Sequence, residues 1–349
     1  MNKMNNEGPI KAVGLFSGGL DSTLATRIML EQGMQVAALH FRTAFSYVER
    51  NRQAGRGPAT ASDAERAAAT LGINLEVIDV SAGYLALVLN PRYGYGSGMN
   101  PCVDCRIFLL RQAKVWMEEH GYHFIFSGEV IGQRPKSQMR PSLNTVERES
   151  GLRGYLVRPL SAKLLKTTVP EERGWVDRDK LYGISGRGRK AQIALAEQFG
   201  ITDYAQPSGG CCYLIDKTYS RRLRDFLARE GAEALTADHV QLLAVGRHLR
   251  LASGRKIVVG RHERENEYLD GCNVDGVWLT TVDHPGPTTL IAGKAAREEI
   301  ELAARITAGY SDGKEEATVR VQMRANGNGL VEVLTVEPMP KEEARSLMV

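Results

Sequence analysis

The sequence predicts an α/β fold with a doubly wound parallel sheet, followed by a second, smaller α+β domain. In the first half of the chain, short apolar runs alternate with segments of helical spacing. A glycine-containing turn joins the first apolar run directly to the first helical segment. After about Thr236, strand-like segments dominate instead. These three observations separate a parallel-sheet domain from a β-rich one.

Four apolar runs of the first half are expected to be buried strands, with helices between them. The predicted strands are Ala12–Phe16, Val36–Phe41, Leu75–Val80 and Phe124–Phe126, and the predicted helices are Asp21–Gln32, Ser62–Leu71 and Cys105–His120. Nearly continuous apolar strands indicate a sheet that is covered on both faces. Such sheets bind ligands beyond the carboxyl ends of their strands, so functional residues are expected in the loops that follow.

The second half is expected to begin with two helices and to end in the α+β domain. The helices are predicted at Arg189–Phe199 and from about Thr218, and the later elements are strands Lys256–Val259, Val277–Val282, Thr318–Met323 and Val331–Val336 with a helix at Ala292–Gly309. We therefore predict a leader at 1–10, a first domain at 11–216, a helical linker at 217–239 and a last domain at 240–349.

The composition excludes several classes of protein. Of 349 residues, 43% are hydrophobic and 25% are charged, which is ordinary for a globular chain that builds its own core. Five cysteines are too few for a disulfide scaffold. No apolar run reaches the ~18–20 residues of a membrane helix, and the first ten residues lack the apolar segment of a signal peptide. We expect a cytoplasmic protein with no membrane partner; the oligomeric state stays open.

Positive charge is concentrated in one stretch. The whole chain has a net charge of +4, yet residues 132–192 hold 14 Lys or Arg against 6 Asp or Glu, an excess of eight. The densest cluster is Arg187, Arg189 and Lys190, which lie among glycines, and Arg134 and Lys136 precede it. Because phosphate contacts dominate affinity for nucleic acids, this stretch predicts an RNA-facing surface.

The turn after the first strand has the features of a phosphate-binding loop. It reads Ser17-Gly18-Gly19-Leu20-Asp21-Ser22 and opens a helix. The glycines allow backbone N–H groups to approach an anion, and the new helix adds unpaired N–H groups with a partial positive charge. Ser17 and Ser22 supply hydroxyls, and Asp21 is a candidate ligand for Mg²⁺. No lysine follows the glycines, so this is not a Walker A loop.

Four of the five cysteines occur in two pairs. Cys102 and Cys105 lie at the start of the predicted helix Cys105–His120, and Cys211 and Cys212 follow two glycines. A helix N-terminus favours thiolate, which suits nucleophilic or metal-bound sulfur. Three chemistries compete with inert burial: an iron–sulfur cluster, a structural zinc site, and persulfide and disulfide chemistry without metal. Adjacent cysteines in an extended segment point to opposite faces, so three ligands are more natural than four.

The loop SGGLDS resembles the PP-loop of the ATP pyrophosphatases. This resemblance implies an adenine nucleotide alpha hydrolase-like fold that binds ATP with Mg²⁺, releases pyrophosphate and leaves AMP on a carbonyl oxygen of the substrate. Ser17, Gly18, Gly19, Asp21 and Ser22 would hold the β- and γ-phosphates. The end of the second strand, with His40 and Phe41, would lie near the adenine, although His40 could also simply fill the strand end. Gly128 would line the same crevice.

Two further segments resemble tRNA thiolation enzymes. Ser127–Gln133, followed by Ser137 and Gln138, resembles the TGE-x-x-GQ-x-x-SQ segment of the tRNA 4-thiouridine synthases. Asn100–Cys105 is similar to the NPDxxC motif of the tRNA 2-thiouridylases, which places Cys105 on their first sulfur-handling cysteine. Ser208–Leu214 resembles the segment of their second one, where Cys212 matches best and Cys211 is the alternative. The implied activity is a tRNA sulfurtransferase that adenylates a uridine and replaces its oxygen with sulfur.

One position departs from the 2-thiouridylase pattern. Cys102 stands where those enzymes carry an acidic residue. The extra thiol makes the chain resemble the cluster-dependent tRNA thiolases, which implies a [4Fe-4S] cluster on Cys102, Cys105 and Cys212. The sulfur donor would be sulfide or a persulfide derived from a cysteine desulfurase, and Cys105, Cys212 and Asp21 would carry the chemistry.

The last domain also resembles a known family. Ile257–Arg261 and Glu265–Leu269 resemble the "VGR…N…L" segment of NFACT-type RNA-binding domains, which implies an RNA-binding module. The alternative is an accessory domain that only packs on the catalytic one, and tRNA is the partner that the sulfurtransferase resemblance implies. Two other functions remain open: a PP-loop ligase or sulfur-insertion enzyme that acts on a small molecule, and an RNA-binding protein whose PP-loop is only structural.

Overall fold

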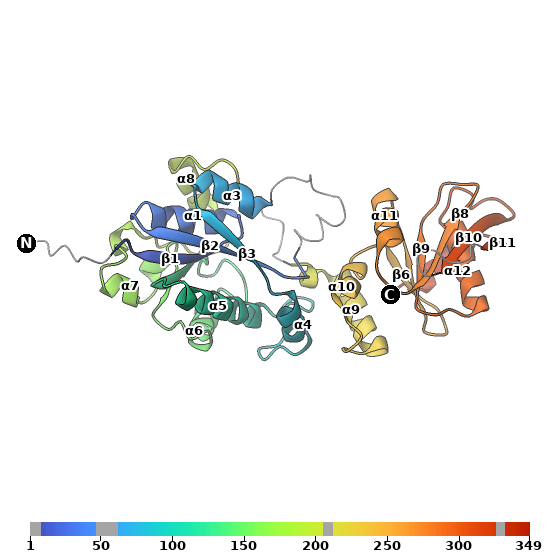
Figure 1. Ribbon diagram of the computed structural model, residues 1–349, viewed down its shortest axis with the longest axis horizontal. Coiled ribbons are helices and arrows are strands. Elements are labelled where there is room, and N and C mark those ends of the chain that lie inside the picture. Colours follow the sequence, from blue (N-terminus) through green and yellow to red (C-terminus); the bar gives the residue numbers. More distant parts are fainter. Residues whose placement is uncertain (1–7, 47–61, 205–211, 326–331) are drawn as a thin grey trace, which may run out of the picture. The chain divides into compact units, whose positions relative to one another are not determined.

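In the computed structural model, which describes residues 8–46, 62–204, 212–325 and 332–349, the chain divides into two units (Figure 1). The first unit holds the described residues 8–43 and 62–204, and the second holds 44–46, 212–325 and 332–349. Residues 217–239, which we expected to be a linker, fall within the second unit. None of the helices in these described ranges is long and apolar enough to cross a membrane.

The first unit is built on a parallel sheet of five strands in the order β3-β2-β1-β4-β5. The strands are β1 (Lys11–Leu15), β2 (Gln35–Arg42), β3 (Asn74–Asp79), β4 (Phe124–Ser127) and β5 (Leu156–Val157). Ala12 of β1 pairs in parallel with Val36 of β2 on one side and with Phe124 of β4 on the other. The predicted parallel sheet is confirmed.

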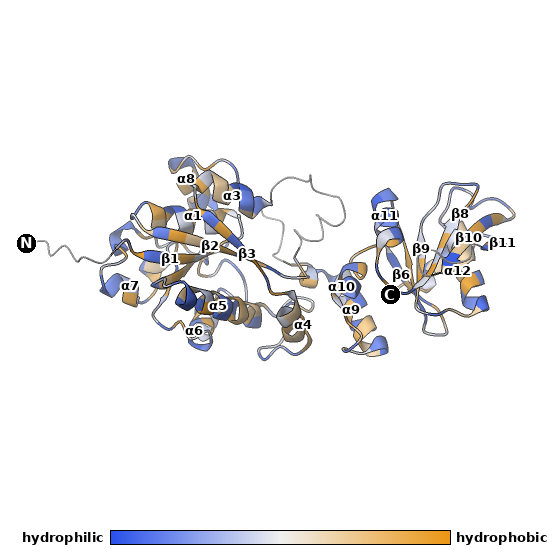
Figure 2. Ribbon diagram, viewed as in Figure 1, coloured by the Kyte–Doolittle hydropathy of each residue, from blue (hydrophilic) through white to orange (hydrophobic). Residues whose placement is uncertain are grey.

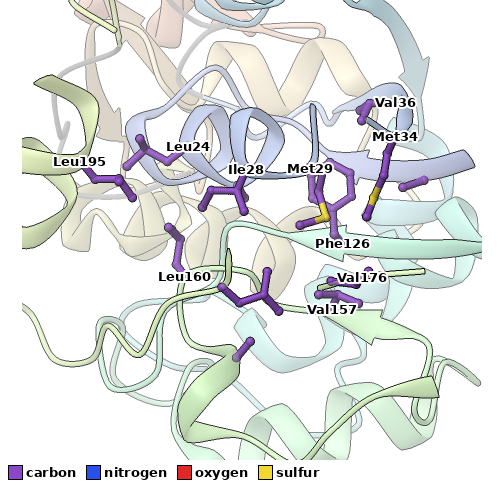
Figure 3. Close-up of a cluster of buried hydrophobic side chains, with 14 of the residues drawn as sticks. Leu24, Ile28, Met29, Met34, Val36, Phe126, Val157, Leu160, Val176 and Leu195 are labelled. Carbon is purple, nitrogen blue, oxygen red and sulfur yellow. The ribbon is translucent and has the colours of Figure 1, made fainter. Parts of the chain in front are cut away.

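Helices cover both faces of this sheet because alternate side chains of each strand point to opposite faces. Ala12 belongs to one cluster with Leu24 and Ile28 of α1 (Leu20–Leu30) and Leu195 of α8 (Lys190–Gln198), and Figure 3 shows these three helix side chains. Val13 belongs to another cluster with Leu110 of α5 (Cys102–Glu119). β1 and β2 are accordingly largely hydrophobic, and the outer helices combine hydrophobic and hydrophilic residues (Figure 2). The α-helices of the unit are α1 (Leu20–Leu30), α3 (Asp63–Leu71), α4 (Ser81–Leu89), α5 (Cys102–Glu119), α6 (Arg140–Glu149), α7 (Val169–Glu172) and α8 (Lys190–Gln198).

The elements α4, β5, α6 and α7 of the first unit were not expected from the sequence. The segment of α4 is a nearly unbroken apolar run without clear helical periodicity. The strand β5 has only two residues, and its pairing with Ile125 and Phe126 of β4 defines it. Helix α6 is mostly polar and begins with Pro141 in its first turn. The apolar run of α4 and the two residues of β5 carry no clear pattern of their own, so these two elements depend on their tertiary neighbours.

The order of the strands places a topological switch point at β1. The chain leaves β1 toward β2 on one side, and β4 pairs on the other side of β1. In open α/β sheets the ligand crevice lies at such a point, outside the carboxyl ends of the strands. Residues 16–19 follow β1 and residues 128–133 follow β4, so both loops lie at this edge.

The second unit contains an antiparallel six-stranded sheet in the order β11-β10-β8-β9-β7-β6. Its elements are α9 (Lys217–Glu230), α10 (Ala237–Leu242), β6 (Arg247–Arg250), β7 (Lys256–Val259), α11 (Glu263–Gly271), β8 (Gly276–Thr281), β9 (Thr289–Ala292), α12 (Arg297–Gly309), β10 (Val319–Ala325), β11 (Glu332–Val336) and α13 (Lys341–Ser346). Helix α12 packs on one face of the sheet and closes a hydrophobic core there.

Helix α12 starts later than the sequence predicted. We expected a helix from Ala292 to Gly309, but Thr289–Ala292 is a strand that pairs with β7 and β8. The chain turns at Gly293, whose φ of 75° suits glycine, and α12 begins at Arg297. The smaller α+β domain itself is confirmed.

Candidate functional site

The turn after β1 has the geometry of an anion-binding loop. Gly18 has a φ of 73°, and a Cβ atom there would lie 2.4 Å from the carbonyl carbon of Asp63. Helix α1 follows, with Gly19 as an N-cap that offers no side-chain hydrogen bond. The Ser22 hydroxyl donates to the Gly19 carbonyl at 2.9 Å and holds the turn closed. The first amides of α1 therefore have no side-chain cap, and an anion suits this position.

The loop after β4 lies directly against the first turn of α1. A Cβ atom on Gly128 would be 2.6 Å from the carbonyl oxygen of Asp21 and 2.6 Å from the amide nitrogen of Ser22. Only glycine allows this approach, because a Cβ atom would overlap backbone atoms that cannot move aside. Gly128, which was predicted to line the nucleotide crevice, therefore lies against the phosphate-type loop, the turn from Ser17 to Ser22.

Asp21 points one carboxylate oxygen at protein donors and leaves the other unpaired. Its Oδ2 accepts a hydrogen bond of 2.7 Å from Nε2 of Gln133, and Nη2 of Arg189 lies 3.9 Å from the same oxygen. Its Oδ1 is buried and has no hydrogen-bond partner among the described residues. An unpaired buried carboxylate oxygen is costly unless it has a ligand, and carboxylate oxygen is what Mg²⁺ prefers. Asp21 therefore fits a Mg²⁺ ion.

His40 and Phe41 lie near the end of β2, as expected, and their contacts are with neighbouring residues of the first unit. Nδ1 of His40 is 3.0 Å from the carbonyl oxygen of Phe16, the residue that precedes Ser17. Burial lowers the pKa of His40 below its ordinary value, more than the hydrogen bond to Phe16 raises it. The neutral imidazole therefore donates a hydrogen bond from Nδ1 to the Phe16 carbonyl and stabilises the start of the loop Ser17–Ser22. Phe41 packs at the rim of the core beneath α5.

Cys102 and Cys105 both lie in the first turn of α5. Pro101 is the N-cap of this helix and provides no side-chain cap. Residues three apart share a helix face, and both cysteines are partly exposed there. The structure therefore places two thiols at a helix N-terminus, where the positive end of the helix dipole stabilises thiolate.

The second cysteine pair is described only in part. Cys211 lies outside the described residues. Cys212 is buried in the second unit, where it forms a short antiparallel bridge with Ser46. Cys102 and Cys105 belong to the first unit. Within the part of the chain that the structure describes, no group of three or more His, Cys, Asp or Glu side chains is arranged to hold a metal ion.

A buried ion network supports the first turn of α5. Glu129 is 2% exposed and accepts hydrogen bonds from Nε of Arg158 at 3.0 Å and from the Ser127 hydroxyl at 3.2 Å. Nε of Arg106 lies 3.4 Å from its other oxygen. Burial alone would raise the pKa of Glu129, but the two arginines outweigh it and hold that pKa below the ordinary value. Glu129 thus fixes the residue that follows Cys105.

The predicted RNA contacts divide into separate groups. Arg187 and Lys190 are exposed at the start of α8, and Arg134 is partly buried. Arg189 reaches toward Asp21 instead. The ammonium of Lys136 donates to the carbonyl oxygens of Gly94 at 3.0 Å and Tyr95 at 2.5 Å, so it ties down the loop before the cysteines.

Two glutamines complete the surroundings of Asp21. Nε2 of Gln192, which is fully buried on α8, lies 3.3 Å from Oε1 of Gln133. Gln133 belongs to a motif that the sequence singled out, but Gln192 was missed. Its only signal is a polar residue at a position of α8 that the apolar neighbours Leu195 and Ala196 mark as the inner face.

Two family matches together cover most of the chain. Residues 11–169 match the tRNA methyl transferase HUP domain, and residues 246–348 match the NFACT protein RNA binding domain. The first unit thus contains a segment that matches a HUP domain model, and the second contains a segment that matches an NFACT-type RNA-binding domain model. The resemblance to NFACT-type RNA-binding domains is confirmed, and the match to a HUP domain agrees with the resemblance drawn from the PP-loop.

Curated relatives of the chain are tRNA-specific 2-thiouridylases. The enzyme MnmA of Syntrophotalea carbinolica is 40% identical over 106 residues, which cover 28% of this chain and 29% of the relative. MnmA of Petrotoga mobilis is 24% identical and aligns over 62% of this chain and 58% of the relative. MnmA of Pelotomaculum thermopropionicum is 23% identical over 85% of this chain and 83% of the relative. The chain thus matches less than a third of the first relative's length.

A solved structure of a 4-thiouridine synthetase–RNA complex with bound ATP is 22% identical and covers 55% of this chain and 41% of that chain. Its TM-score against this chain is 0.34.

Proposed function

We propose that this protein is an ATP-dependent tRNA sulfurtransferase. It adenylates the carbonyl oxygen of a tRNA uridine, releases pyrophosphate, and replaces that oxygen with sulfur as AMP leaves. The observation that carries the proposal is the phosphate-type loop with the unpaired Oδ1 of Asp21, in a chain that is similar to tRNA 2-thiouridylases. The RNA-binding domain in the same chain supports tRNA as the substrate.

In this proposal the loop residues bind and orient ATP. Backbone amides of Gly18, Gly19 and the first turn of α1 hold the β- and γ-phosphates, and Ser17 and Ser22 add hydroxyl donors. Asp21 holds the Mg²⁺ ion, which when bound offsets charge on the departing pyrophosphate. Arg189 lies close enough to Asp21 to offset part of the same charge.

The sulfur step uses the thiols of the first turn of α5. In the simplest form, a hydrosulfide attacks the activated base carbon, the carbon–sulfur bond forms, the carbon–oxygen bond to AMP breaks, and one proton is lost. Cys102 and Cys105 would supply two thiolates to a [4Fe-4S] cluster, which when bound would carry this sulfur. The alternative is a persulfide on Cys105 or Cys212 that was charged by a cysteine desulfurase.

The nature of the sulfur carrier is tested by anaerobic purification. We expect the protein to contain iron and labile sulfide, and we expect Cys102→Ser to lose both. An iron-free anaerobic preparation with full activity would exclude the cluster and leave the persulfide route.

The function as a whole is tested by mass spectrometry of tRNA nucleosides from cells with and without the protein. We expect one thiolated uridine to disappear in the deletion strain and to return when the wild-type protein, but not an Asp21→Asn variant, is supplied. An unchanged nucleoside profile would contradict the proposal and favour a ligase that acts on a small molecule. The identity of the missing nucleoside, a 2-thiouridine or a 4-thiouridine, also distinguishes 2-thiolation from 4-thiolation.

A further inference from the structure

Gln192 is a polar side chain with no solvent exposure on the inner face of α8. Its Oε1 has no hydrogen-bond partner among the described residues, so the fold buries an amide oxygen without compensation. Buried polar groups are almost always paired, and an unpaired one calls for a reason other than stability. Residue 192 also lies beyond the segment 11–169 that matches the HUP domain.

We propose that Gln192 is a positioning residue for the metal-binding carboxylate of Asp21 and that it acts through Gln133. The inference rests on the proposed role of Asp21 as the Mg²⁺ ligand. Nε2 of Gln192 donates to Oε1 of Gln133 at 3.3 Å, and Nε2 of Gln133 donates to Oδ2 of Asp21 at 2.7 Å. Three side chains from three separate segments thus form one directed chain of hydrogen bonds.

The direction of this chain determines which atoms meet the metal. An amide has one donor end and one acceptor end, so donation from Gln192 fixes the oxygen of Gln133 toward α8 and its NH₂ group toward Asp21. A rotated Gln133 would present its oxygen to the carboxylate and repel it. With Oδ2 held by Gln133, only Oδ1 of Asp21 remains for a cation.

The backbone around the chain is fixed by other contacts. The amide of Gly186 donates to the carbonyl of Ile131 at 2.7 Å. The buried Ser161 hydroxyl donates to the carbonyl of Ile184 at 2.7 Å and accepts from the amide of Ile131 at 3.1 Å. These bonds join the segment before α8 to the loop that carries Gln133. The distance between the two glutamines is therefore set by the fold, as a positioning role requires.

Gln192→Leu tests the proposal, because leucine fills a similar volume without a donor. The measurement is the affinity for Mn²⁺, read by electron paramagnetic resonance with an ATP analogue whose α,β-bridge cannot be cleaved. We expect the affinity for Mn²⁺ to fall about tenfold, as is typical when a group behind a metal ligand is lost. We expect the melting temperature to stay the same or to rise, because the unpaired buried oxygen is removed.

Two further variants separate positioning from packing. Gln192→Glu has the same shape, and its carboxylate when ionised can only accept, so under those conditions Gln133 turns its NH₂ group away from Asp21 and we expect weaker Mn²⁺ binding than in Gln192→Leu. Gln133→Ala changes a partly exposed side chain and should lose Mn²⁺ affinity to about the same extent as Gln192→Leu. It provides the test if the variants of the buried Gln192 fail to fold. Gln198→Leu on the exposed side of α8 is the matched control and should bind Mn²⁺ like the wild type.

Wild-type Mn²⁺ affinity in folded Gln192→Leu, or in Gln133→Ala, would overturn the proposal. If Gln192→Leu lost Mn²⁺ affinity and also melted at a clearly lower temperature than the wild type, Gln192 would act only through stability. That result would also overturn the proposal. A wild-type protein that binds Mn²⁺ and the nucleotide but thiolates no tRNA would contradict the proposed function, while the expected loss in Gln192→Leu would still support the positioning role.

Discussion

Two aspartates, one in each unit, are used in opposite ways. Asp21 in the first unit leaves its buried Oδ1 unpaired and receives one short hydrogen bond on Oδ2. Asp225 in the second unit is fully engaged: Arg250 donates to both of its oxygens at 2.6 and 3.2 Å, and the ammonium of Lys256 donates at 3.2 Å. The first carboxylate can still accept a ligand, whereas the second is saturated by protein cations.

The electrostatic setting of Asp225 shows what saturation achieves. Burial would raise the pKa of Asp225, but Arg250 and Lys256 outweigh it and hold that pKa below the ordinary value. Lys256 is 6% exposed, and burial lowers its pKa to about 8 despite Asp225. Together these groups link α9 to β6 and β7. A saturated charge cluster of this kind holds elements together, and an unsaturated one at a loop is where chemistry is expected.

The largest expected effect is on catalysis. Asp21→Asn keeps the hydrogen-bonding shape but removes the charge that the Mg²⁺ ion needs, so ATP-dependent pyrophosphate release should fall by about a hundredfold or more. Affinity for tRNA should stay within about twofold, because no phosphate contact is removed. Quenched-flow measurement of pyrophosphate checks the first expectation and filter binding checks the second. Unchanged turnover would remove Asp21 from the metal role and with it the contrast to Asp225.

The counterpart in the second unit is a stability effect. Asp225→Asn leaves Lys256 buried without its counter-charge, and breaking such a pair costs about 3 kcal/mol of unfolding free energy. Urea unfolding followed by circular dichroism measures this loss. Asp283→Asn, which breaks an exposed pair with Arg320, is the control, and its loss of unfolding free energy should be much smaller. Equal losses in both variants would show that the buried cluster has no special role.

Cations of the first unit that remain exposed should affect RNA binding and not stability. Replacement of both Arg187 and Lys190 by alanine should weaken tRNA binding about tenfold at low salt and reduce the slope of log affinity against log salt by about two. Lys114→Ala, which breaks an exposed pair with Glu118, is the control. Titrations over a range of salt concentrations decide this point. A control that changes the slope as much as the double variant would refute a dedicated RNA surface.

The smallest effect expected is a change in pH dependence. The pKa of Lys256 is about 8 in the folded protein and about 10.4 in an unfolded chain, so the unfolded state binds more protons between these values. The unfolding free energy of the wild type should therefore rise by about 1 kcal/mol from pH 8 to pH 9 relative to Lys256→Met. Denaturant titrations at the two pH values measure the difference. If the unfolding free energies of the wild type and Lys256→Met changed by the same amount from pH 8 to pH 9, the folded-state pKa of Lys256 would not lie near 8.

The sequence was most informative where local chemistry decides the structure. The loop from Ser17 to Ser22 could be recognised because a tight turn, a helix start and close backbone approach all demand particular residues at fixed spacing. The strands β1, β2 and β4 were predicted within two residues of their bounds because burial on both faces leaves an unbroken apolar run. Among the missed elements, the strands β5 and β9 are short and depend on pairing with distant segments.

By itself, the sequence determined the two fold classes, the phosphate-type loop, and the residue types available for metal, sulfur and RNA. Only the tertiary structure decided which of those groups are engaged. It committed Lys136 to the carbonyls of Gly94 and Tyr95, turned Arg189 toward Asp21, and placed the buried Gln192 behind Gln133. The physical reason is that a hydrogen bond depends on distance and direction between groups far apart in the chain, which the fold sets and no local pattern contains.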